Sequence, residues 1–249
     1  MPTLKLSYGL ASTQGSKHTT NDDRAAAFIW PDVARFNRET VGLFIIADAF
    51  NSQKVPATAS QLAVDIVADE IKAYIFEPSE LSIEHLMTGA FQKANTKILE
   101  LTPDDGATLT AALLIGHQLH IAHVGDTRAY YINNASAIQL TKDHVYLGPI
   151  SIIEEWAEVT PRQPRRVLYR ALGQSETIEV DYRNEQLVPD SYLLLCTDGL
   201  INLESTFTAD ELLPSITNHA PQIACDQLIE LAQKHDSTDD ISVIVVKVQ

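Results

Sequence analysis

Short runs of strand-forming residues recur along this chain, and they constrain its fold more than any other feature. The runs lie at 4–10, 25–30, 41–48, 108–116, 118–126, 128–132, 191–199 and 241–248. Several alternate apolar and polar residues, and turn residues separate many of them, which is typical of antiparallel sheets. The segments GHQ (116–118) and NNAS (133–136) are typical of hairpin turns.

Three further segments carry apolar residues at helical spacing, namely 58–76, 82–101 and 224–235. The first two are adjacent, which predicts an antiparallel helix pair lying on one sheet. No internal repeat, low-complexity tract or linker interrupts the 249 residues. We therefore expect a single α+β domain over residues 1–249, with sheets inside and helices outside.

Charge and cysteine content narrow the class of protein. The formal net charge is −15, which argues against a nucleic-acid or anionic-membrane partner, because both require clustered Lys and Arg. No apolar stretch approaches the roughly 20 residues of a membrane span. The two cysteines, Cys196 and Cys225, are too few for a disulfide scaffold. We expect a cytoplasmic protein with no nucleic-acid or membrane partner.

Aspartates occur at five places where a predicted strand meets a loop. They are Asp22 with Asp23, Asp48, Asp126, Asp198 and Asp239. One such residue alone is explained by a turn or a cap. Strand ends at one edge converge, however, and converging carboxylates repel one another unless cations neutralise them. Mg²⁺ and Mn²⁺ prefer oxygen ligands, so the pattern predicts a two-metal centre of the kind that promotes attack on phosphorus.

Several motifs occur in an order that resembles a known family. They are GSKHTTNDD (15–23), IIADAF (45–50), GATLTAALL (106–114), AHVGDTRAYYI (122–132), LTKDH (140–144), VLYRALG (167–173), LLLCTDGL (193–200) and TDDISVIVV (238–246). The chain resembles the metal-dependent serine/threonine protein phosphatases of type 2C in their bacterial single-domain form. That resemblance implies a four-layer αββα sandwich, two antiparallel β-sheets flanked by helix pairs, with a flap at about 144–166.

The resemblance also implies a site and a reaction. Asp48 is expected to bridge two Mn²⁺ or Mg²⁺ ions, with the Ala49 carbonyl, Asp198 and Asp239 as further ligands. Asp48, Asp198 and Asp239 would carry catalysis, in which a bridging hydroxide attacks phosphorus in line. Two more sets of ligands are implied: Asp22 and Asp23 acting through water, and Asp126 with Asp198 at a third metal site. The expected partners are a phosphoserine or phosphothreonine protein and a Ser/Thr kinase or its targets, and the protein is expected to be a monomer.

Three positions depart from the family pattern. His18 stands where the family usually has an Arg that grips phosphate, and Lys17 or Arg24 could substitute for it. Asp22 replaces the usual Glu of an acidic pair. Residues 49–52 read Ala-Phe-Asn-Ser in place of a glycine-rich loop, which would strain Ala49 if it required a positive φ.

These departures leave three functional hypotheses open. The leading one is a metal-dependent protein phosphatase, and the alternatives are a weakly catalytic type 2C-like binding module and a hydrolase of small phosphoesters. Arg162, Arg165 and Arg166 are hypothesised to meet acidic phosphopeptides. Residues expected to be structural are Cys196, His120, His123 and His144, with Arg128 expected to pair with an acidic neighbour.

Overall fold

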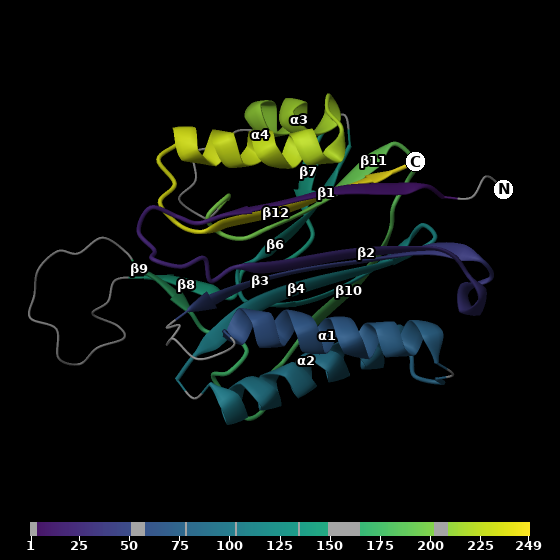
Figure 1. Ribbon diagram of the computed structural model, residues 1–249, viewed down its shortest axis with the longest axis horizontal. Coiled ribbons are helices and arrows are strands. Elements are labelled where there is room, and N and C mark those ends of the chain that lie inside the picture. Colours follow the sequence, from purple (N-terminus) through teal and green to yellow (C-terminus); the bar gives the residue numbers. More distant parts are fainter. Residues whose placement is uncertain are drawn as a thin grey trace, which may run out of the picture.

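Two five-stranded antiparallel sheets pack face to face over the residues that the computed structural model describes (Figure 1). Those residues are 4–50, 58–77, 79–102, 104–133, 135–148, 165–201 and 209–249. The first sheet has the order β1 (Leu6–Thr13), β12 (Ile241–Val248), β11 (Ser191–Cys196), β6 (Arg128–Ile132) and β7 (Ala137–Gln139). The second has the order β10 (Asp181–Gln186), β5 (Gln118–Val124), β4 (Gly106–Ile115), β3 (Glu39–Phe50) and β2 (Arg24–Val33).

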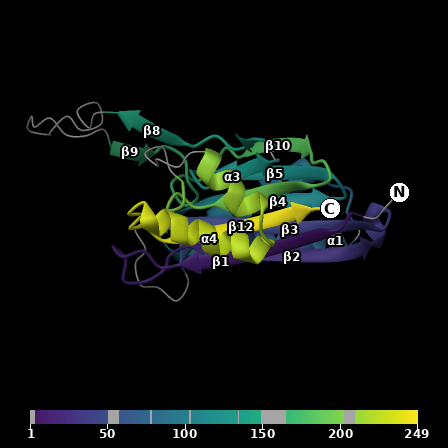
Figure 2. The ribbon, with the colours of Figure 1, turned by 90° about the horizontal axis from the view of Figure 1, so that it is seen from above.

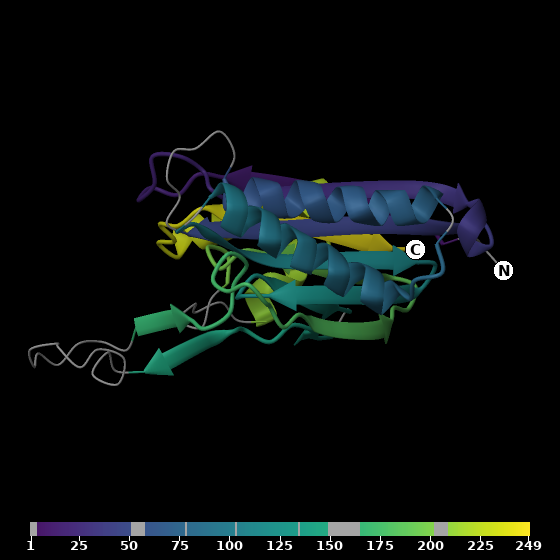
Figure 3. The ribbon, with the colours of Figure 1, turned by 90° about the horizontal axis from the view of Figure 1, so that it is seen from below.

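Helices cover the outer face of each sheet, which confirms the predicted four-layer arrangement (Figures 2 and 3). The helices are α1 (Ala59–Phe76) and α2 (Ile83–Leu101) on the second sheet, and α3 (Ala209–Thr217) and α4 (Pro221–Lys234) on the first. Hydroxyl caps explain where the first two begin. Thr58 accepts a bond from the Gln61 N–H, and Ser82 accepts one from the His85 N–H. Such a cap contributes about 1 kcal/mol to helix stability.

The apolar run in β3 fills two core layers at once. Successive side chains of a strand point to opposite faces. Phe44 and Ile46 therefore pack between the sheets, while Leu43 and Ile45 pack under α1 and α2. All four are fully buried, and each such side chain contributes roughly 1.5–3 kcal/mol relative to exposure. The continuous apolar sequence is the consequence of this central position.

The structure also contains elements that the sequence pattern did not predict. They are β7, β10, α3, a 3₁₀ turn (Ala34–Phe36), and a hairpin of β8 (Val145–Gly148) and β9 (Arg165–Leu168). Helix α4 begins at Pro221, three positions before the predicted start at 224. The predicted turn at 133–136 is confirmed, since the Asn133 N–H donates to the Ser136 carbonyl at 3.0 Å. Of the predicted flap, residues 149–164, including Arg162, lie outside the described residues.

Strand polarity gives the sandwich two different ends. Strands β3, β5 and β11 finish at the end drawn on the left of Figure 1, where β2, β4 and β12 begin. Both described chain ends lie at the opposite end. There, Lys5 and Gln249 exchange two backbone hydrogen bonds of 2.8 and 2.9 Å.

Candidate functional site

The predicted aspartates are collected at the left-hand end of the sandwich by the strand register. Arg24 pairs with Ala47, which places Asp23 beside Asp48. Cys196 pairs with both Arg128 and Val243, which brings the loops of Asp198, Asp126 and Asp239 to the same end. We call Asp23, Asp48, Asp126, Asp198 and Asp239 the carboxylate cluster.

The other four members of the cluster all influence the pKa of Asp48. Its pKa is raised well above the usual range, first by loss of hydration and then by the other four members, Asp198, Asp23, Asp126 and Asp239. Negative charges raise a carboxyl pKa only from close range. The other four members of the cluster therefore lie within electrostatic range of Asp48.

Asp23 supplies a buried oxygen that has no protein partner in the described residues. Its side chain is 2% exposed, and the Thr197 hydroxyl donates to Oδ2 at 2.9 Å. Oδ1 is buried without a hydrogen bond. Burial raises the pKa of Asp23 to about 7, and Asp198 and Asp240 add to that effect. A buried carboxylate oxygen left unpaired is costly, and a cation is the partner that offsets the cost.

The donor set of the cluster fits a hard divalent cation. All five side chains offer carboxylate oxygens, which suit Mg²⁺ and Mn²⁺. Among the described residues, no three His, Cys, Asp or Glu side chains are arranged closely enough to enclose an ion as they stand. The chemistry of the cluster thus fits a metal, while the individual metal–ligand bonds stay predictions.

Asp240 is a site residue that the sequence did not identify. It is 3% exposed, and its carboxylate accepts three hydrogen bonds. The donors are the Gly15 N–H at 2.7 Å, the Asp22 N–H at 2.8 Å and His18 Nδ1 at 3.0 Å. Asp240 therefore ties the loop before β2 to the turn before β12. Its adjacency to Asp239 was the available signal, but nothing in the sequence indicated which of the two faces inward.

His18 lies directly beside the cluster. Its Nδ1 bonds to Asp240, and its Nε2 lies 3.4 Å from Asp239 Oδ1. The hydrogen bond to Asp240 raises the pKa of His18, with further contributions from the charges of Asp240, Asp239 and Asp22. The side chain remains 38% exposed. The imidazole therefore lies partly exposed at the edge of the cluster, where its neighbours favour the protonated form.

The other predicted phosphate-binding residues lie in different surroundings. Arg24 directs Nη1 to the carbonyls of Asn21 and Asp23 and Nε to Gln61, so its guanidinium braces the loop. Lys17 is exposed, with its backbone N–H bonded to the Thr238 carbonyl. Their contact with substrate stays a prediction.

Asp22 is placed differently from its neighbour Asp23. Its Oδ1 accepts a bond from the Thr20 hydroxyl at 3.2 Å, and its charge acts on His18. A role for Asp22 in metal binding through water stays a prediction.

Ala49 does not need the backbone conformation of the glycine that the family pattern has at its position. Strand β3 continues through Phe50, and Ala49 pairs with Ala107 in the regular antiparallel register. Ala49 is not among the non-glycine residues with positive φ, so the strain considered from the sequence does not arise. Phe50 lies over Gly106, where an added Cβ would come within 2.2 Å of the Phe50 ring. Asn51 and Ser52 lie outside the described residues.

Residues expected to be structural have structural surroundings. Arg128 forms a bidentate ion pair with Asp143, in which Nε–Oδ1 is 2.9 Å and Nη2–Oδ2 is 2.6 Å. Burial raises the pKa of the Cys196 thiol to about 12, which excludes a thiolate nucleophile at neutral pH. His120 Nδ1 lies 2.7 Å from the Tyr182 hydroxyl.

Comparison with known proteins assigns this arrangement to a family. The profile described as Protein phosphatase 2C matches residues 8–146, which include the loops of Asp23, Asp48 and Asp126. The chain belongs to the Protein phosphatase 2C family. The profile described as Stage II sporulation protein E (SpoIIE) matches residues 79–249, which include Asp198 and Asp239.

Two relatives that are named serine/threonine phosphatases align over most of the chain. Serine/threonine phosphatase stp of Listeria monocytogenes serotype 4b is 29% identical, over 85% of this chain and 86% of that protein. Serine/threonine protein phosphatase PstP of Mycobacterium tuberculosis is 28% identical, over 99% of this chain and 46% of that protein.

Two solved structures show the same fold. The PstP catalytic domain in complex with two manganese ions has a TM-score of 0.73 and 25% identity, and the alignment covers 99% of each chain. A serine/threonine phosphatase of S. agalactiae has a TM-score of 0.77 and 24% identity, with 98% of this chain and 100% of that chain covered. Within the described part of the chain, none of the helices is both long and apolar enough to cross a membrane.

Proposed function

We propose that this Protein phosphatase 2C family member is a Mn²⁺- or Mg²⁺-dependent phosphatase that hydrolyses phosphoserine and phosphothreonine in proteins. The grouping of four carboxylates around Asp48 is the observation that carries the proposal, because bound cations would offset their repulsion while leaving them ionised. The relatives named serine/threonine phosphatases and the two manganese ions of the PstP structure support it. Residues 1–249 would constitute one phosphatase domain.

Each aspartate of the cluster would have its own role in metal binding. Asp48, at the centre, would bridge two cations, and the Ala49 carbonyl, Asp198 and Asp239 would complete the direct ligands. When bound, the cations supply Lewis-acid polarisation of the phosphate and activation of water for in-line attack. The orphaned Oδ1 of Asp23 would accept from metal-coordinated water, with Asp22 beside it. Asp126, together with Asp198, would serve a third site.

His18 would take the place of the family's phosphate-gripping Arg. Asp240 holds its Nδ1, so its second N–H, on Nε2, is directed to the edge of the cluster beside Asp239. A positive donor there would attract a dianionic phosphate, although with one bond where an Arg makes two. We infer a phosphate grip that is correctly placed but weaker than that of an Arg.

The wider biological setting follows from the same assignment. The substrate would be a phosphoprotein, such as a Ser/Thr kinase or one of its targets, acted on by a monomer. Both cysteines are unbridged and buried, which suits a reducing compartment such as the cytoplasm.

The decisive experiment compares Asp198→Asn with a matched control, Asp236→Asn. Asp236 is exposed and lies outside the cluster, and its left-handed backbone (φ 59°) is one that Asn tolerates. Turnover of an aryl phosphate and of a phosphothreonine peptide is measured with Mn²⁺. Loss of direct ligation removes several kcal/mol of transition-state stabilisation, so Asp198→Asn should lose on the order of a thousandfold in turnover. The control should match the wild type.

Two other results would redirect the assignment. If the wild type shows no Mn²⁺-dependent turnover above Asp198→Asn, the chain is a binding module and not an enzyme. If it hydrolyses the aryl phosphate but not the peptide, it is a small-phosphoester hydrolase.

A further inference from the structure

Two buried histidines lie beneath the loop that carries Asp126, and the proposed reaction does not use them. His123 and His144 are each 1% exposed, and their ring centroids are 5.0 Å apart. The His144 ring bonds Gly125 directly, and the His123 ring reaches Thr127 through the Thr110 hydroxyl.

His144 holds Gly125 by two hydrogen bonds. The backbone N–H of His144 donates to the Gly125 carbonyl at 2.7 Å. The backbone N–H of Gly125 donates to the ring atom Nδ1 of His144 at 2.9 Å. A backbone N–H can only donate, so Nδ1 must be an acceptor and the ring proton must lie on Nε2. Nε2 then donates to Asp181 Oδ2 at 3.2 Å. Arg170 Nη1 lies 3.1 Å from Nε2, but both are donors, and they converge on Asp181.

Gly125 cannot relax away from this contact at low cost. Its φ of +109° is a conformation that side-chain-bearing residues rarely adopt, and an added Cβ would lie 2.4 Å from Thr108 Cβ. Thr108 in turn donates to the Asp48 carbonyl at 3.4 Å. Gly125 is therefore confined between His144 and the strand that pairs with Asp48.

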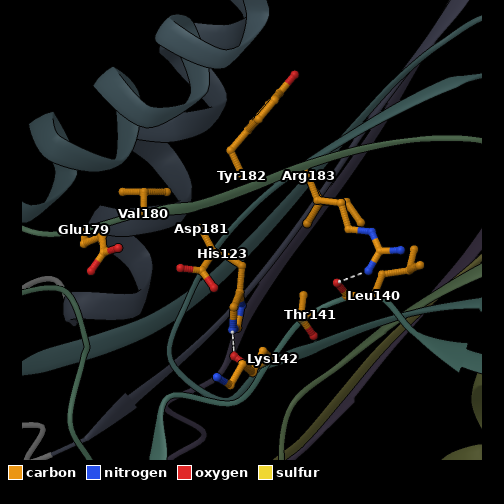
Figure 4. Close-up of a pocket in the computed structure, with 10 residues that line it drawn as sticks. His123, Leu140, Thr141, Lys142, Glu179, Val180, Asp181, Tyr182 and Arg183 are labelled. Atoms are coloured by element: carbon orange, nitrogen blue, oxygen red, sulfur yellow. Dashed lines mark hydrogen bonds between the residues drawn. The ribbon is translucent and has the colours of Figure 1, made fainter.

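His123 secures the other side of the same loop. Its Nε2 donates to the Lys142 carbonyl at 3.1 Å (Figure 4). This leaves Nδ1 to accept from the Thr110 hydroxyl at 2.9 Å. Thr110 accepts in turn from the hydroxyl of Thr127, at 2.7 Å. Asp126 thus lies between one residue fixed by His144 and another fixed through His123.

The outer partners of His144 lie on the edge strand β10 and directly after strand β9. Asp181 lies on the edge strand β10 and lines a hollow of ≈450 Å³ with His123 and Lys142 (Figure 4). The Tyr169 N–H donates to the His144 carbonyl at 3.0 Å, directly after β9. His144 therefore connects the β8–β9 hairpin and the sheet edge to the Asp126 loop.

We propose that His144 is a positioning residue that sets the place of Asp126 in the metal centre through its Nδ1 bond to the Gly125 N–H. The inference rests on the proposed metal-dependent function and assigns to His144 a contribution to metal affinity. Partners that orient metal ligands are worth about 10–100-fold in affinity. The effect should fall on the metal-binding step that uses Asp126.

The test separates the two ring nitrogens with a matched pair of substitutions in the full chain. His144→Asn keeps an acceptor near the Nδ1 position and loses the contact with Asp181. His144→Gln keeps a donor near the Nε2 position and loses the acceptor for Gly125. Mn²⁺ binding is measured by titration calorimetry, with thermal unfolding of each variant as the control for overall stability.

We expect His144→Gln to weaken the lowest-affinity Mn²⁺ binding step about tenfold, and His144→Asn to retain most of it. Equal affinities in the two variants would overturn the proposal. If the wild type binds Mn²⁺ without hydrolysing phosphopeptides, the proposed enzyme activity fails, and calorimetry still decides the role of His144. If the wild type binds no Mn²⁺, both fail.

A measurement on the unsubstituted protein covers the case in which a variant does not fold. Saturating Mg²⁺, a diamagnetic ion, should shift the ¹⁵N resonances of Gly125 and His144 Nδ1 together, because one hydrogen bond joins them. A His144 Nδ1 resonance that does not respond while Asp126 responds would overturn the proposal.

Discussion

His18 Nδ1 lies 3.0 Å from Asp240 Oδ2, a contact between residues that are 222 positions apart in the chain. It fixes the imidazole beside Asp239 and leaves Nε2 directed to the edge of the carboxylate cluster. The proposed phosphate grip depends on this pair.

Replacing His18 tests that dependence. His18→Arg should improve kcat/KM for a phosphothreonine peptide about tenfold, mainly through a lower KM, because a guanidinium binds phosphate through two parallel bonds. His18→Gln removes the charge and should raise KM by a similar factor. Steady-state kinetics with Mn²⁺ at fixed saturation measures both. Identical KM values for Arg, His and Gln would exclude residue 18 from phosphate binding.

Substituting Asp48 should have opposite effects on stability with and without metal. The raised pKa of Asp48 means that its charge destabilises the metal-free fold at neutral pH. Asp48→Asn should therefore increase the free energy of unfolding by about 1 kcal/mol in EDTA. It should also abolish the stabilisation that Mn²⁺ gives the wild type, which is about 2.7 kcal/mol at a hundredfold excess over Kd. Urea unfolding with EDTA or Mn²⁺ measures both; a destabilised metal-free variant would contradict the account.

The buried Arg128–Asp143 pair should be a major stability element. Its side chains are 5% and 8% exposed, so Asp143→Ala leaves a buried guanidinium without its partner. We expect a loss of about 3–5 kcal/mol in the free energy of unfolding. The matched control is Glu185→Ala, which breaks the exposed pair with Arg183 and should cost less than about 1 kcal/mol. Similar losses for the two variants would contradict this ranking.

Acid should destabilise the fold through His123. Burial, and then the neighbouring His144, lower the pKa of His123 to about 4, although the Lys142 carbonyl, Asp181 and Asp143 oppose that shift. The unfolded state, with a pKa of about 6.5, binds the proton first, so stability is full above that pH and is lost as pH falls toward 4. The loss is on the order of 3 kcal/mol. His123→Gln keeps a donor for the Lys142 carbonyl and should reduce this fall in the free energy of unfolding, measured by urea unfolding at pH 7, 6 and 5. If the variant loses as much stability on acidification as the wild type, other groups cause the loss.

The sequence predicts an element correctly where its pattern of apolar residues matches the burial of that element in the fold. The strand at 41–48 is continuous and apolar because it is buried on both faces, and Asp48 ends it at the centre of the cluster. Edge strand β10 has the sequence DYRNEQ, which has no apolar face to recognise. Helix α3 contains Pro214, which sequence rules treat as a helix breaker.

The site was predictable to the same extent. Asp residues at strand ends are visible in sequence because a carboxylate beside a buried run is unusual. Asp240 and the Gly125–His144 contact are not visible, since each depends on chain segments that only the fold brings together.

The pairing of Lys5 with Gln249 brings the outer ends of β1 and β12 together at the end of the sandwich away from Asp48. A short peptide linking these two residues would join the two strands without disturbing the β1–β12 ladder. New ends could then be opened in a surface turn such as Gly116–His117, which joins β4 to β5. Circular permutation of this kind would change where folding begins while preserving the metal-binding end of the protein.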